Sequence, residues 1–334
     1  MTHQKDKLLL YGASGYTGKI IAERAKELNL DFEIAGRSED KIRTMARELN
    51  VAYHCYTVED FEAWERALAN KKVLINAAGP FHATAAPAMK ACLKAGVHYL
   101  DISAELGSYQ LAESLDEEAK AADIQLMSGA GLFVSYDALV VHLSKLVDEP
   151  LHLKVGFRHY GGFSGGSVAS SKNIADLGIL IRKEGVITVN LNPQPKVFSF
   201  GKEEVECLPT PLGGIILSYK SIGIPNIEEF FSLKLPATEL PDLTPENLPD
   251  GPTREERSAG RNGISAELTG KDGEAVQAYV DAPSGYDLTP LSVVAVANRI
   301  LKGDFKVGYQ SPGSAYGEDI INDIPDTYLI DLNI

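Results

Sequence analysis

Short apolar runs alternate with amphipathic stretches between Lys7 and Met127. The runs have the length of buried strands, and the stretches between them repeat apolar residues at helical spacing. The runs that we expect to be strands are Lys7–Tyr11, Phe32–Ala35, Val51–Tyr56, Val73–Ala77, Tyr99–Ile102 and Ile124–Met127. The stretches that we expect to be helices are Thr17–Leu28, Glu39–Leu49, Glu59–Leu68, Thr84–Ala95 and Ser108–Ala122. This alternation predicts an α/β fold, a doubly wound parallel sheet of Rossmann type.

The pattern changes near Pro150, where longer alternating stretches begin. The strands expected here are Leu151–Tyr160, Phe198–Leu208, Ile264–Leu268 and Ala275–Asp281, with a helix at Ser167–Lys183 and a surface loop at Pro236–Arg261. Thr289–Leu301 is an amphipathic helix with Pro290 in its first turn. We therefore expect a Rossmann domain at 1–135 and a second α+β domain at 150–285 for substrate binding or dimerisation. A C-terminal helix and tail at 286–334 should return to the Rossmann domain.

The charge balance narrows the classes of partner. The chain has 32 Lys and Arg against 46 Asp and Glu, a net charge of −14. This argues against nucleic acid and against an anionic membrane surface as partners. The N-terminus is short and polar rather than a signal peptide. The three cysteines form no CxxC pair, so we expect no metal site and a reducing, cytoplasmic location.

A glycine-rich segment follows the first expected strand and opens the first expected helix. Its glycines are spaced G-x-x-G-x-x-G rather than G-x-G-x-x-G. Gly12 would allow the sharp turn, Gly15 would let the backbone approach a pyrophosphate, and Gly18 would let the helix pack on the strand. The expected cofactor contacts also include Ser14, Tyr16 and Thr17. The alternative is a merely structural turn.

Arg37 follows the second expected strand, 22 residues after Gly15. An NAD-dependent enzyme usually places an acidic residue there, on the ribose hydroxyls. A guanidinium would instead bind a 2′-phosphate with paired donors, and Ser38 would add a hydroxyl. The sequence therefore favours NADP(H) over NAD(H). The alternative is an exposed loop arginine without a ligand.

Several segments together resemble the saccharopine dehydrogenase-like oxidoreductases, including the trans-acting enoyl reductase branch. The matching segments are YGASGYTGKIIAERA, IAGRSEDKI, VLINAAGPF, KACLKAGVHYLDISAE, SGGSVASS, GYDLTP and QSPGSAYGEDII. The chain departs from the family pattern at Ala104 and at Ala83–Ala86, where glycine is common. The resemblance implies an NADP-dependent oxidoreductase that transfers hydride to or from a C=N, C=O or C=C bond of a small substrate. A non-catalytic NADP(H) sensor and a partner-dependent reductase subunit are the alternatives.

Catalytic candidates lie where expected strands end. Asp101 and Glu105 follow one strand and would orient substrate or relay a proton, although Asp101 could instead cap the next helix. His159 and Tyr160 are candidate proton donors, although a lone histidine is more often structural. A turn of small residues should lie along the nicotinamide ribose, namely Asn76, Ala77, Ala78, Gly79 and Pro80. By analogy we also expect a homodimer through the second domain's sheet.

Overall fold

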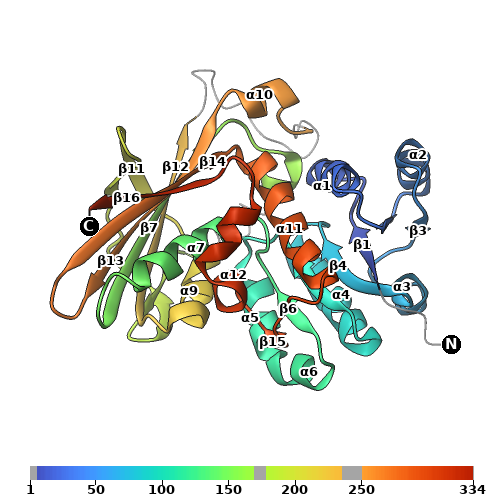
Figure 1. The fold of residues 1–334 in the computed structure, drawn as a ribbon, viewed down its shortest axis with the longest axis horizontal. Helices are drawn as coiled ribbons and strands as arrows, with labels where there is room; N and C mark the ends of the chain where they lie inside the picture. Colours follow the sequence, from blue (N-terminus) through green and yellow to red (C-terminus); the bar gives the residue numbers. More distant parts are fainter. Residues whose placement is uncertain (1–5, 169–177, 235–249, 334) are drawn as a thin grey trace. The chain divides into compact units, whose positions relative to one another are not determined.

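The computed structural model describes residues 6–168, 178–234 and 250–333, and Figure 1 shows its ribbon. The chain divides into two compact units. The first, here called the Rossmann unit, comprises Met1–Gly131 and Thr289–Gln310. The second, here called the mixed-sheet unit, comprises Leu132–Leu288 and Ser311–Ile334. None of the described helices combines the length and apolar composition needed to cross a bilayer.

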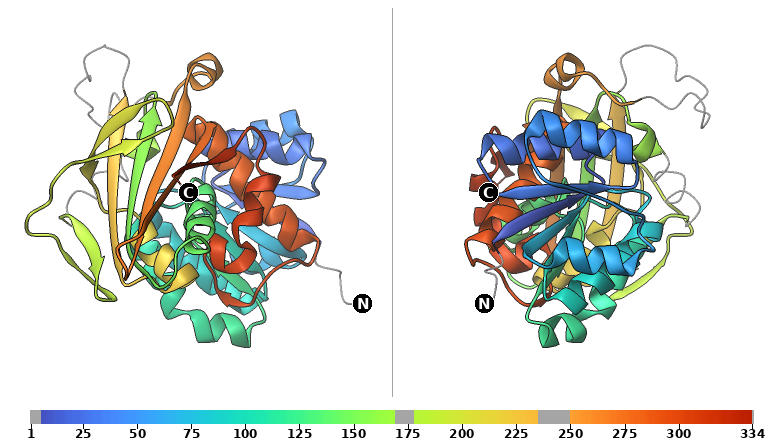
Figure 2. Two further views of the ribbon diagram at one scale, coloured as in Figure 1. Left: turned by 60° about the vertical axis from the view of Figure 1, so that its left-hand side comes forward. Right: turned by 90° about the vertical axis from the view of Figure 1, so that its right-hand side faces the viewer.

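The Rossmann unit is a parallel sheet with the strand order β15-β6-β5-β4-β1-β2-β3. Its strands are β1 (Lys7–Tyr11), β2 (Phe32–Gly36), β3 (Tyr53–Cys55), β4 (Lys71–Asn76), β5 (His98–Asp101), β6 (Gln125–Met127) and β15 (Gly308–Tyr309). Its helices are α1 (Tyr16–Glu27), α2 (Glu39–Leu49), α3 (Phe61–Leu68), α4 (Phe81–Ala95), α5 (Leu106–Ser114) and α6 (Asp116–Ala121). Helices cover both faces of this sheet (Figure 2). The order from β3 to β6 is that of the dinucleotide-binding fold, so the predicted fold class is confirmed.

The strand β1 occupies the centre of this sheet, between β2 and β4. Tyr11 at its end pairs with Ala35 of β2 and Asn76 of β4. Leu8, Leu9 and Leu10 are fully buried, as expected of a central parallel strand covered on both faces. The turns that follow β1, β2 and β4 therefore meet at one edge, at the point where the strand order reverses.

The mixed-sheet unit has the strand order β10-β11-β12-β7-β13-β14-β16, with the β8–β9 hairpin beside β12. Only β12 and β7 pair in parallel among the described strands of this unit. Its strands are β7 (Pro150–Tyr160), β8 (Leu180–Lys183), β9 (Val186–Val189), β10 (Lys196–Ser199), β11 (Glu204–Pro209), β12 (Asn226–Lys234), β13 (Arg261–Gly270), β14 (Ala275–Pro283) and β16 (Tyr328–Asn333). The helical segments of the unit are α7 (Phe133–Ser144), α9 (Gly214–Ile222), α10 (Arg254–Ser258), α12 (Pro312–Tyr316) and η1 (Glu318–Asp323). The expected second α+β domain is thus present.

Glycines let the β10–β11 hairpin pack tightly against the mixed sheet. A Cβ at Gly156 of β7 would lie 2.5 Å from the Phe198 ring, and one at Gly263 of β13 would lie 2.5 Å from the Phe200 ring. Phe198 and Phe200 belong to a buried cluster with Val205, Cys207 and Phe230. The apolar cluster therefore fixes the hairpin on the sheet.

Three expectations about the second half are wrong. Phe198–Leu208 is a hairpin rather than one strand, because Gly201 turns the chain at a φ of +78°. The expected helix Ser167–Lys183 ends in the strand β8, while residues 169–177 lie outside the described part. The tail does not return to the Rossmann unit as a whole, because β16 pairs with β14. Only 289–310 belongs to that unit, and α11 (Gly285–Leu301) begins earlier than expected.

Candidate functional site

The glycine turn after β1 is packed backbone against backbone. Gly12 has a φ of +81°, and a Cβ there would lie 2.7 Å from the amide nitrogen of Ala78 in the turn after β4. A Cβ at Gly18 would lie 2.3 Å from the carbonyl oxygen of Gly12. No side chain fits at either position without displacing backbone atoms. These close approaches are the ones that the glycine spacing predicts for the first and third glycines.

Among the described residues, no side chain caps the tip of α1. Its N-cap residue is Gly15, with no side-chain cap and no acidic residue in the first turn. By contrast, α3 is capped by the carboxylate of Asp60, which accepts from the Ala63 N–H at 2.9 Å. The positive end of the α1 dipole therefore lacks the compensation that α3 has within the protein. A phosphate group is a suitable ligand for such a helix tip.

Arg37 lies directly after β2 and is exposed. It makes no hydrogen bond or ion pair to the described residues, whereas the acidic residues that follow it have partners. Glu39 accepts from the Tyr53 hydroxyl at 2.9 Å, and Asp40 accepts from Arg43 at 2.7 Å. Ser38 is the N-cap of α2 but makes no side-chain cap. The Arg37 guanidinium and the Ser38 hydroxyl thus remain available to a ligand.

Ser14 connects the glycine turn to the end of β2. A Cβ at Gly36 would lie 3.6 Å from the Ser14 hydroxyl oxygen. Gly36 is the residue immediately before Arg37, so the main chain of the glycine turn and the end of β2 are neighbours. Tyr16 and Thr17 begin α1 directly after the glycine turn. The structure therefore brings together the residues predicted to contact the two phosphate groups of the cofactor.

The buried side chain of Asn76 holds the turn after β4 in place through hydrogen bonds and is not exposed on the surface of this turn. The Asn76 side chain is fully buried and donates to Thr84 and to Tyr99, at 3.2 Å each. Its oxygen accepts from the Ala78 N–H at 3.1 Å. All polar groups of the Asn76 side chain are bonded within the protein, and its contact with cofactor stays a prediction. Contact with cofactor stays a prediction for Ala77, Ala78, Gly79 and Pro80.

Asp101 at the end of β5 accepts hydrogen bonds from several neighbouring segments of the Rossmann unit. Its side chain is fully buried, and burial raises the pKa of its carboxyl group above the usual value. Five donors reach its two oxygens, at 2.6 to 3.0 Å. They are the N–H groups of Ser103 and Gly129 and the hydroxyls of Tyr99, Ser108 and Ser128. Both oxygens of Asp101 thus accept hydrogen bonds within the protein, and its predicted catalytic role stays a prediction.

Glu105 caps the N-terminus of helix α4, although it follows Phe81, the first residue of that helix, by 24 residues. Its carboxylate oxygens accept from the N–H groups of Phe81 at 3.0 Å and His82 at 2.9 Å. A carboxylate at this helix end is favourable because it faces the positive end of the helix dipole. Glu105 is 5% exposed and holds the start of α4, and its predicted role in proton transfer stays a prediction.

His159 and Tyr160 end the strand β7 in the mixed-sheet unit. Burial lowers the pKa of His159 to about 4, and the nearby carbonyl group of Gly162 acts against this lowering. The His159 imidazole is therefore neutral near pH 7, and its predicted role as a proton donor stays a prediction. Tyr160 is 36% exposed and packs on Gly260, where a Cβ would lie 1.7 Å from its ring. Its role as proton donor stays a prediction.

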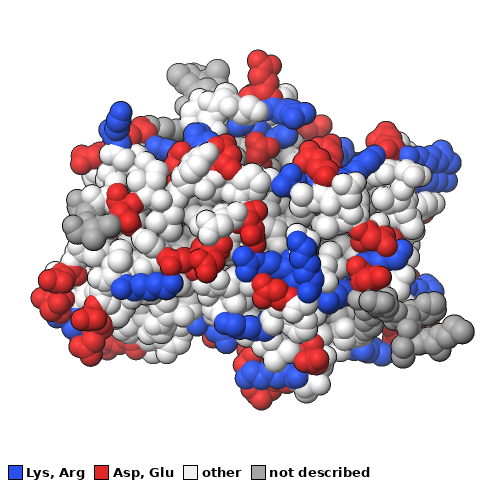
Figure 3. All heavy atoms as spheres, in the orientation of Figure 1, with Lys and Arg blue, Asp and Glu red and all other residues white. Residues whose placement is uncertain are grey.

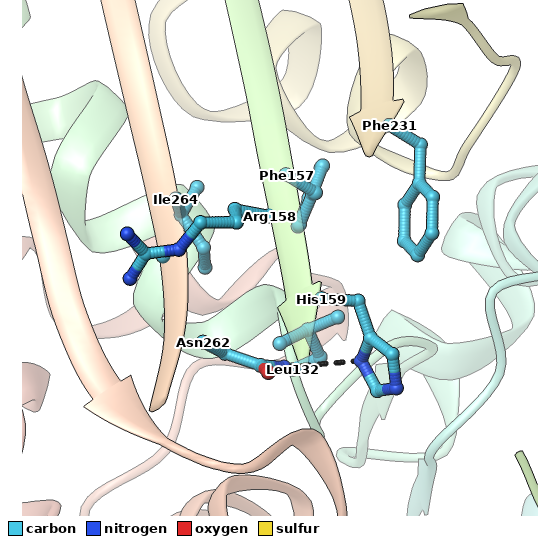
Figure 4. A pocket seen from close by; sticks show the side chains of 8 residues that line it. Leu132, Phe157, Arg158, His159, Phe231, Asn262 and Ile264 are labelled. Atoms are coloured by element: carbon cyan, nitrogen blue, oxygen red, sulfur yellow. Dashed lines mark hydrogen bonds between the residues drawn. The ribbon is translucent and has the colours of Figure 1, made fainter. Parts of the chain in front are cut away.

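Asn262 of β13 is a residue that the sequence did not single out. Its side-chain oxygen accepts from the Tyr160 N–H at 3.0 Å, and its nitrogen lies 3.3 Å from Nδ1 of His159. Figure 4 shows this contact beside a small cavity of about 10 Å³. The side chains around the cavity belong to Leu132, Phe157, Arg158, His159, Phe231, Asn262 and Ile264.

The segment SGGSVASS at 164–171, one of those that resemble the family, is only partly described. The Ser164 N–H donates to the Tyr286 hydroxyl oxygen at 2.6 Å, and the Ser167 and Tyr286 hydroxyls lie 2.7 Å apart. Ser164 is buried, so its polar groups serve this local network. Residues 169–171 of the segment lie outside the described part of the chain.

Charged side chains of both signs lie on the surface. On the face in Figure 3, Lys and Arg side chains are interspersed with Asp and Glu side chains. This mixture accords with the net charge of −14. Among the residues that the structure describes, no group of three or more His, Cys, Asp or Glu is arranged to hold a metal ion.

Comparisons with known proteins show two levels of similarity. Residues 8–127 match the family model of the saccharopine dehydrogenase NADP binding domain. The chain is 30% identical over 139 residues, 37% of its length, to a lipid droplet localized protein of Caenorhabditis elegans. It is 32% identical over 106 residues, 30% of its length, to a trans-acting enoyl reductase of Mycobacterium tuberculosis. These matches cover only 32% and 25% of the relatives' own lengths.

Structural similarity extends further than sequence similarity. The apo histidine-tagged saccharopine dehydrogenase (L-Glu forming) of Saccharomyces cerevisiae has the same fold, with a TM-score of 0.65 at 12% identity. The match covers 98% of this chain and 100% of that chain. The sequence match therefore concerns the first part of the chain, whereas the fold is shared over nearly all of it.

Proposed function

We propose that this chain, whose residues 8–127 match the family model of the saccharopine dehydrogenase NADP binding domain, is an NADP-dependent oxidoreductase. It moves a hydride between nicotinamide and a small organic substrate. The bound cofactor supplies the hydride chemistry, while the protein binds and orients both reactants.

One observation carries the proposed preference for NADP(H). Arg37, at the end of β2, is exposed and makes no hydrogen bond or ion pair to the described residues. A guanidinium there binds a 2′-phosphate through two parallel hydrogen bonds, whereas a carboxylate would repel it. The uncapped tip of α1 receives the pyrophosphate. Both anionic parts of NADP(H) thus find a positive group at the same corner of the sheet.

Other residues of the Rossmann unit keep the site rigid. Asn76 and Glu105 hold the turn after β4 and the start of α4, while Asp101 joins the ends of β5 and β6. We propose that the cofactor's nicotinamide half lies on the exposed part of this turn, Ala77–Pro80. A site built on strand ends varies little in geometry, which favours a fixed distance for hydride transfer.

Which bond of the substrate takes part in hydride transfer depends on the class of substrate. A saccharopine-type reaction would act on a C=N bond, and an enoyl reductase acts on a C=C bond. Tyr160 is the most exposed of the predicted proton donors, because Asp101, Glu105 and His159 are buried. This favours, as a second candidate, a reductase subunit that needs a partner protein, or an NADP(H) sensor. A homodimer also stays a prediction, and light scattering of the purified protein would test it.

The variant Arg37→Glu tests the cofactor assignment. We expect NADPH affinity to fall by more than tenfold and NADH affinity to change by less than threefold, as measured by cofactor fluorescence. Arg43→Glu is the matched control, because Arg43 of the following helix α2 is a partly exposed arginine that is paired with Asp40. It should leave both affinities unchanged. Equal losses of NADPH and NADH in Arg37→Glu would refute the preference.

A turnover panel separates an enzyme from a sensor. NADPH oxidation would be followed with imine-forming pairs of amino acids and oxo acids, with 2-oxo acids alone, and with enoyl thioesters. Turnover of one class identifies the bond that is reduced. Tight NADPH binding without turnover of any class would support the sensor or the partner-dependent subunit.

A further inference from the structure

The strand β9 is an edge strand of the mixed-sheet unit. Among the described strands it pairs only with β8. The turn between the two strands is anchored at the start of β12. The Gly185 N–H donates to the Pro225 carbonyl oxygen at 2.9 Å, and the Glu184 N–H donates to the Asn226 side-chain oxygen at 3.0 Å. The hairpin therefore holds its outer edge in a fixed position, and such an edge can pair with a further strand.

The main-chain groups of Ile187 and Val189 face away from β8. The Asn190 N–H donates to the Ile179 carbonyl oxygen at 2.8 Å. In an antiparallel pair, residues that exchange hydrogen bonds alternate with residues that do not. Thr188 therefore bonds to β8, whereas its neighbours Ile187 and Val189 do not. Two N–H groups and two carbonyl groups are thus directed to the open edge of β9.

The side chains of β9 lack the features that usually protect an edge strand. Its sequence is VITV, without lysine, proline or any charged residue. Val186 is 66% exposed and Val189 is 49% exposed, and Leu191, just beyond the strand, is 92% exposed. The edge strand β10 is instead preceded by Pro195 and begins with Lys196. The exposed apolar edge of β9 therefore favours a partner strand.

The local charge allows a second copy of this chain to approach β9. The whole chain has a net charge of −14, so two copies repel each other over much of their surfaces. The two hairpins at residues 180–209 are different, because their basic and acidic residues balance. The basic residues are Arg182, Lys183, Lys196 and Lys202, and the acidic residues are Glu184, Glu203, Glu204 and Glu206. Two copies can therefore meet here without that repulsion.

We propose that β9 pairs with β9 of a second copy, antiparallel and centred on Thr188. This register places Ile187 opposite Val189 of the second copy, and the two-fold axis repeats the pair. Every outward N–H group of one strand then donates to an outward carbonyl group of the other, which gives four hydrogen bonds between the copies. The β-branched side chains of Ile187 and Val189 face each other, which is a favourable cross-strand pair.

The same register covers Leu191. It brings this side chain opposite Gly185 of the second copy, where a Cβ would lie 3.6 Å from the Tyr219 hydroxyl oxygen. Tyr219 is 39% exposed, so its ring offers apolar surface to Leu191. All of these residues belong to the mixed-sheet unit, and the inference does not depend on the proposed function.

The variant Val189→Pro tests the pairing. Because the Val189 N–H faces the open edge, a proline there removes two of the four hydrogen bonds between the copies and none between β8 and β9. We expect the full-length wild-type protein to dimerise at micromolar concentration in sedimentation velocity. The variant should dimerise at least about tenfold more weakly, because it lacks two hydrogen bonds.

Val197→Pro is the matched control. Val197 is 53% exposed on the edge strand β10. The Phe200 N–H donates to the Glu203 carbonyl oxygen at 2.7 Å, so the alternation along β10 and β11 directs the Val197 N–H to the open edge as well. This variant should dimerise as the wild-type protein does. A dimer weakened by Val197→Pro and not by Val189→Pro would place the interface on β10 and overturn the proposal.

Thr188→Cys tests the register. The two Thr188 residues would form a non-hydrogen-bonded pair, with Cα atoms about 4.5 Å apart, which suits a disulfide. With oxidised glutathione as the oxidant, this variant should form dimers linked by a disulfide. The background is Cys55→Ser, because Cys55 is exposed. Thr44→Cys, at an exposed position of α2, is the control and should remain largely unlinked.

Three results would contradict the interface. They are a wild-type protein that stays monomeric up to millimolar concentration, a dimer that Val189→Pro does not weaken, and equal disulfide linkage in Thr188→Cys and Thr44→Cys. Should Val189→Pro fail to fold, the disulfide linkage decides the matter. NADPH binding is titrated separately. A monomer that binds NADPH overturns only this inference, whereas a dimer linked through residue 188 that does not bind NADPH overturns only the proposed function.

Discussion

Gly18 of α1 lies against the carbonyl oxygen of Gly12, so closely that a Cβ on Gly18 would stand 2.3 Å from that oxygen. The same Cβ would stand 2.9 Å from the Cα of Ala13. Both neighbours are backbone atoms of the turn after β1, which is itself packed on the turn after β4. The position of the α1 tip therefore depends on the absence of a side chain at residue 18.

We expect Gly18→Ala to move α1 away from this turn. The shift should weaken NADPH binding more than tenfold, because it displaces the N–H groups that face the pyrophosphate. It should also cost about 1–3 kcal/mol of unfolding free energy, as overpacking does elsewhere. Cofactor fluorescence and urea unfolding measure the two effects. NADPH affinity equal to that of the wild-type protein would show that the α1 tip does not bind the cofactor.

Gly107→Ala is the matched control in the same unit. Gly107 is an exposed residue of α5, and a Cβ there meets no described atom within 4 Å. Alanine favours helix over glycine by up to about 1 kcal/mol, so this variant should be as stable as the wild-type protein or more stable. NADPH affinity should not change.

Substitutions of Asp101 distinguish a structural role of its carboxylate from a catalytic one. In Asp101→Asn the amide oxygen can still accept from the Ser103 and Gly129 N–H groups, and the three hydroxyls can rotate to accept from the amide nitrogen. We expect a loss of about 1–2 kcal/mol in unfolding free energy. Asp101→Leu leaves all five donors without an acceptor and should cost more than 3 kcal/mol.

The catalytic hypothesis makes the opposite prediction for Asp101→Asn. If the carboxylate relayed a proton, turnover would fall by orders of magnitude while stability changed little. Urea unfolding and kcat, measured on the same preparation, distinguish the two. A large loss of kcat in a fully folded Asp101→Asn protein would support the catalytic role.

The Rossmann unit was largely predictable from sequence, because its signals are local. The expected strands Lys7–Tyr11 and Phe32–Ala35 match β1 and β2, and the glycine spacing anticipates the contacts of Gly12 and Gly18. Buried parallel strands are continuous apolar runs, and amphipathic helices repeat at a fixed period. Neither signal depends on residues far away in the chain.

The roles of the strand-end carboxylates were not predictable, because their partners are distant in sequence. Asp101 accepts from Gly129, 28 residues further on, and Glu105 accepts from Phe81, 24 residues before it. A carboxylate at a strand end has the same sequence signature whether it faces a ligand or backbone N–H groups. Only the fold shows that these two face N–H groups.

In the mixed-sheet unit one overlooked signal was present. The residues between β8 and β9 are Glu184 and Gly185, with φ of +50° and +80°. A two-residue turn with both φ values positive is the preferred connection of a tight β-hairpin, and glycine is favoured there. This turn argues against the helix expected to run to Lys183. The parallel pairing of β12 with β7 had no local signal, because the strands are separated by the intervening hairpins.

Glu229 of β12 should make stability fall as the pH rises. Burial raises the pKa of its carboxyl group from 4.5 to about 8, although the N–H groups of Ile215 and Leu212 act in the opposite direction. Between these values the folded chain keeps a proton that the unfolded chain has lost. The contribution of this group to the unfolding free energy therefore decreases by about 1.4 kcal/mol per pH unit.

Glu229→Gln removes this titration while keeping the shape of the side chain. We expect the variant to gain stability relative to the wild-type protein as the pH rises from 5 to 8, as measured by urea unfolding at each pH. Glu228→Gln is the control, because the neighbouring Glu228 is partly exposed and faces Lys154 at 3.8 Å. It should show no such trend. A constant difference between Glu229→Gln and wild type would mean that Glu229 is ionised throughout.

Glu318 should make the stability of the folded protein decrease as the pH falls, which is the reverse of the effect expected for Glu229. Lys145 donates to one of its oxygens at 2.6 Å, and Nδ1 of His142 lies 2.7 Å from the other. Lys145, then His142, lower the pKa of Glu318 below 4.5 despite partial burial. A carboxyl group whose pKa is lowered by folding stabilises the protein above its unfolded pKa, and that stabilisation is lost as the pH falls through the folded value.

Glu318→Gln should therefore cost about 1 kcal/mol near pH 7, the range of a partly exposed ion pair, and progressively less as the pH falls below 4.5. Asp319→Asn is the control, because Asp319 makes no hydrogen bond or ion pair to the described residues, and it should change stability by less than about 0.5 kcal/mol at any pH. Urea unfolding from pH 3.5 to 7 compares the three proteins. A cost of Glu318→Gln that grew on acidification would mean that the contacts with Lys145 and His142 do not stabilise the ionised carboxylate. The link between α7 and η1 would then have to depend on packing alone.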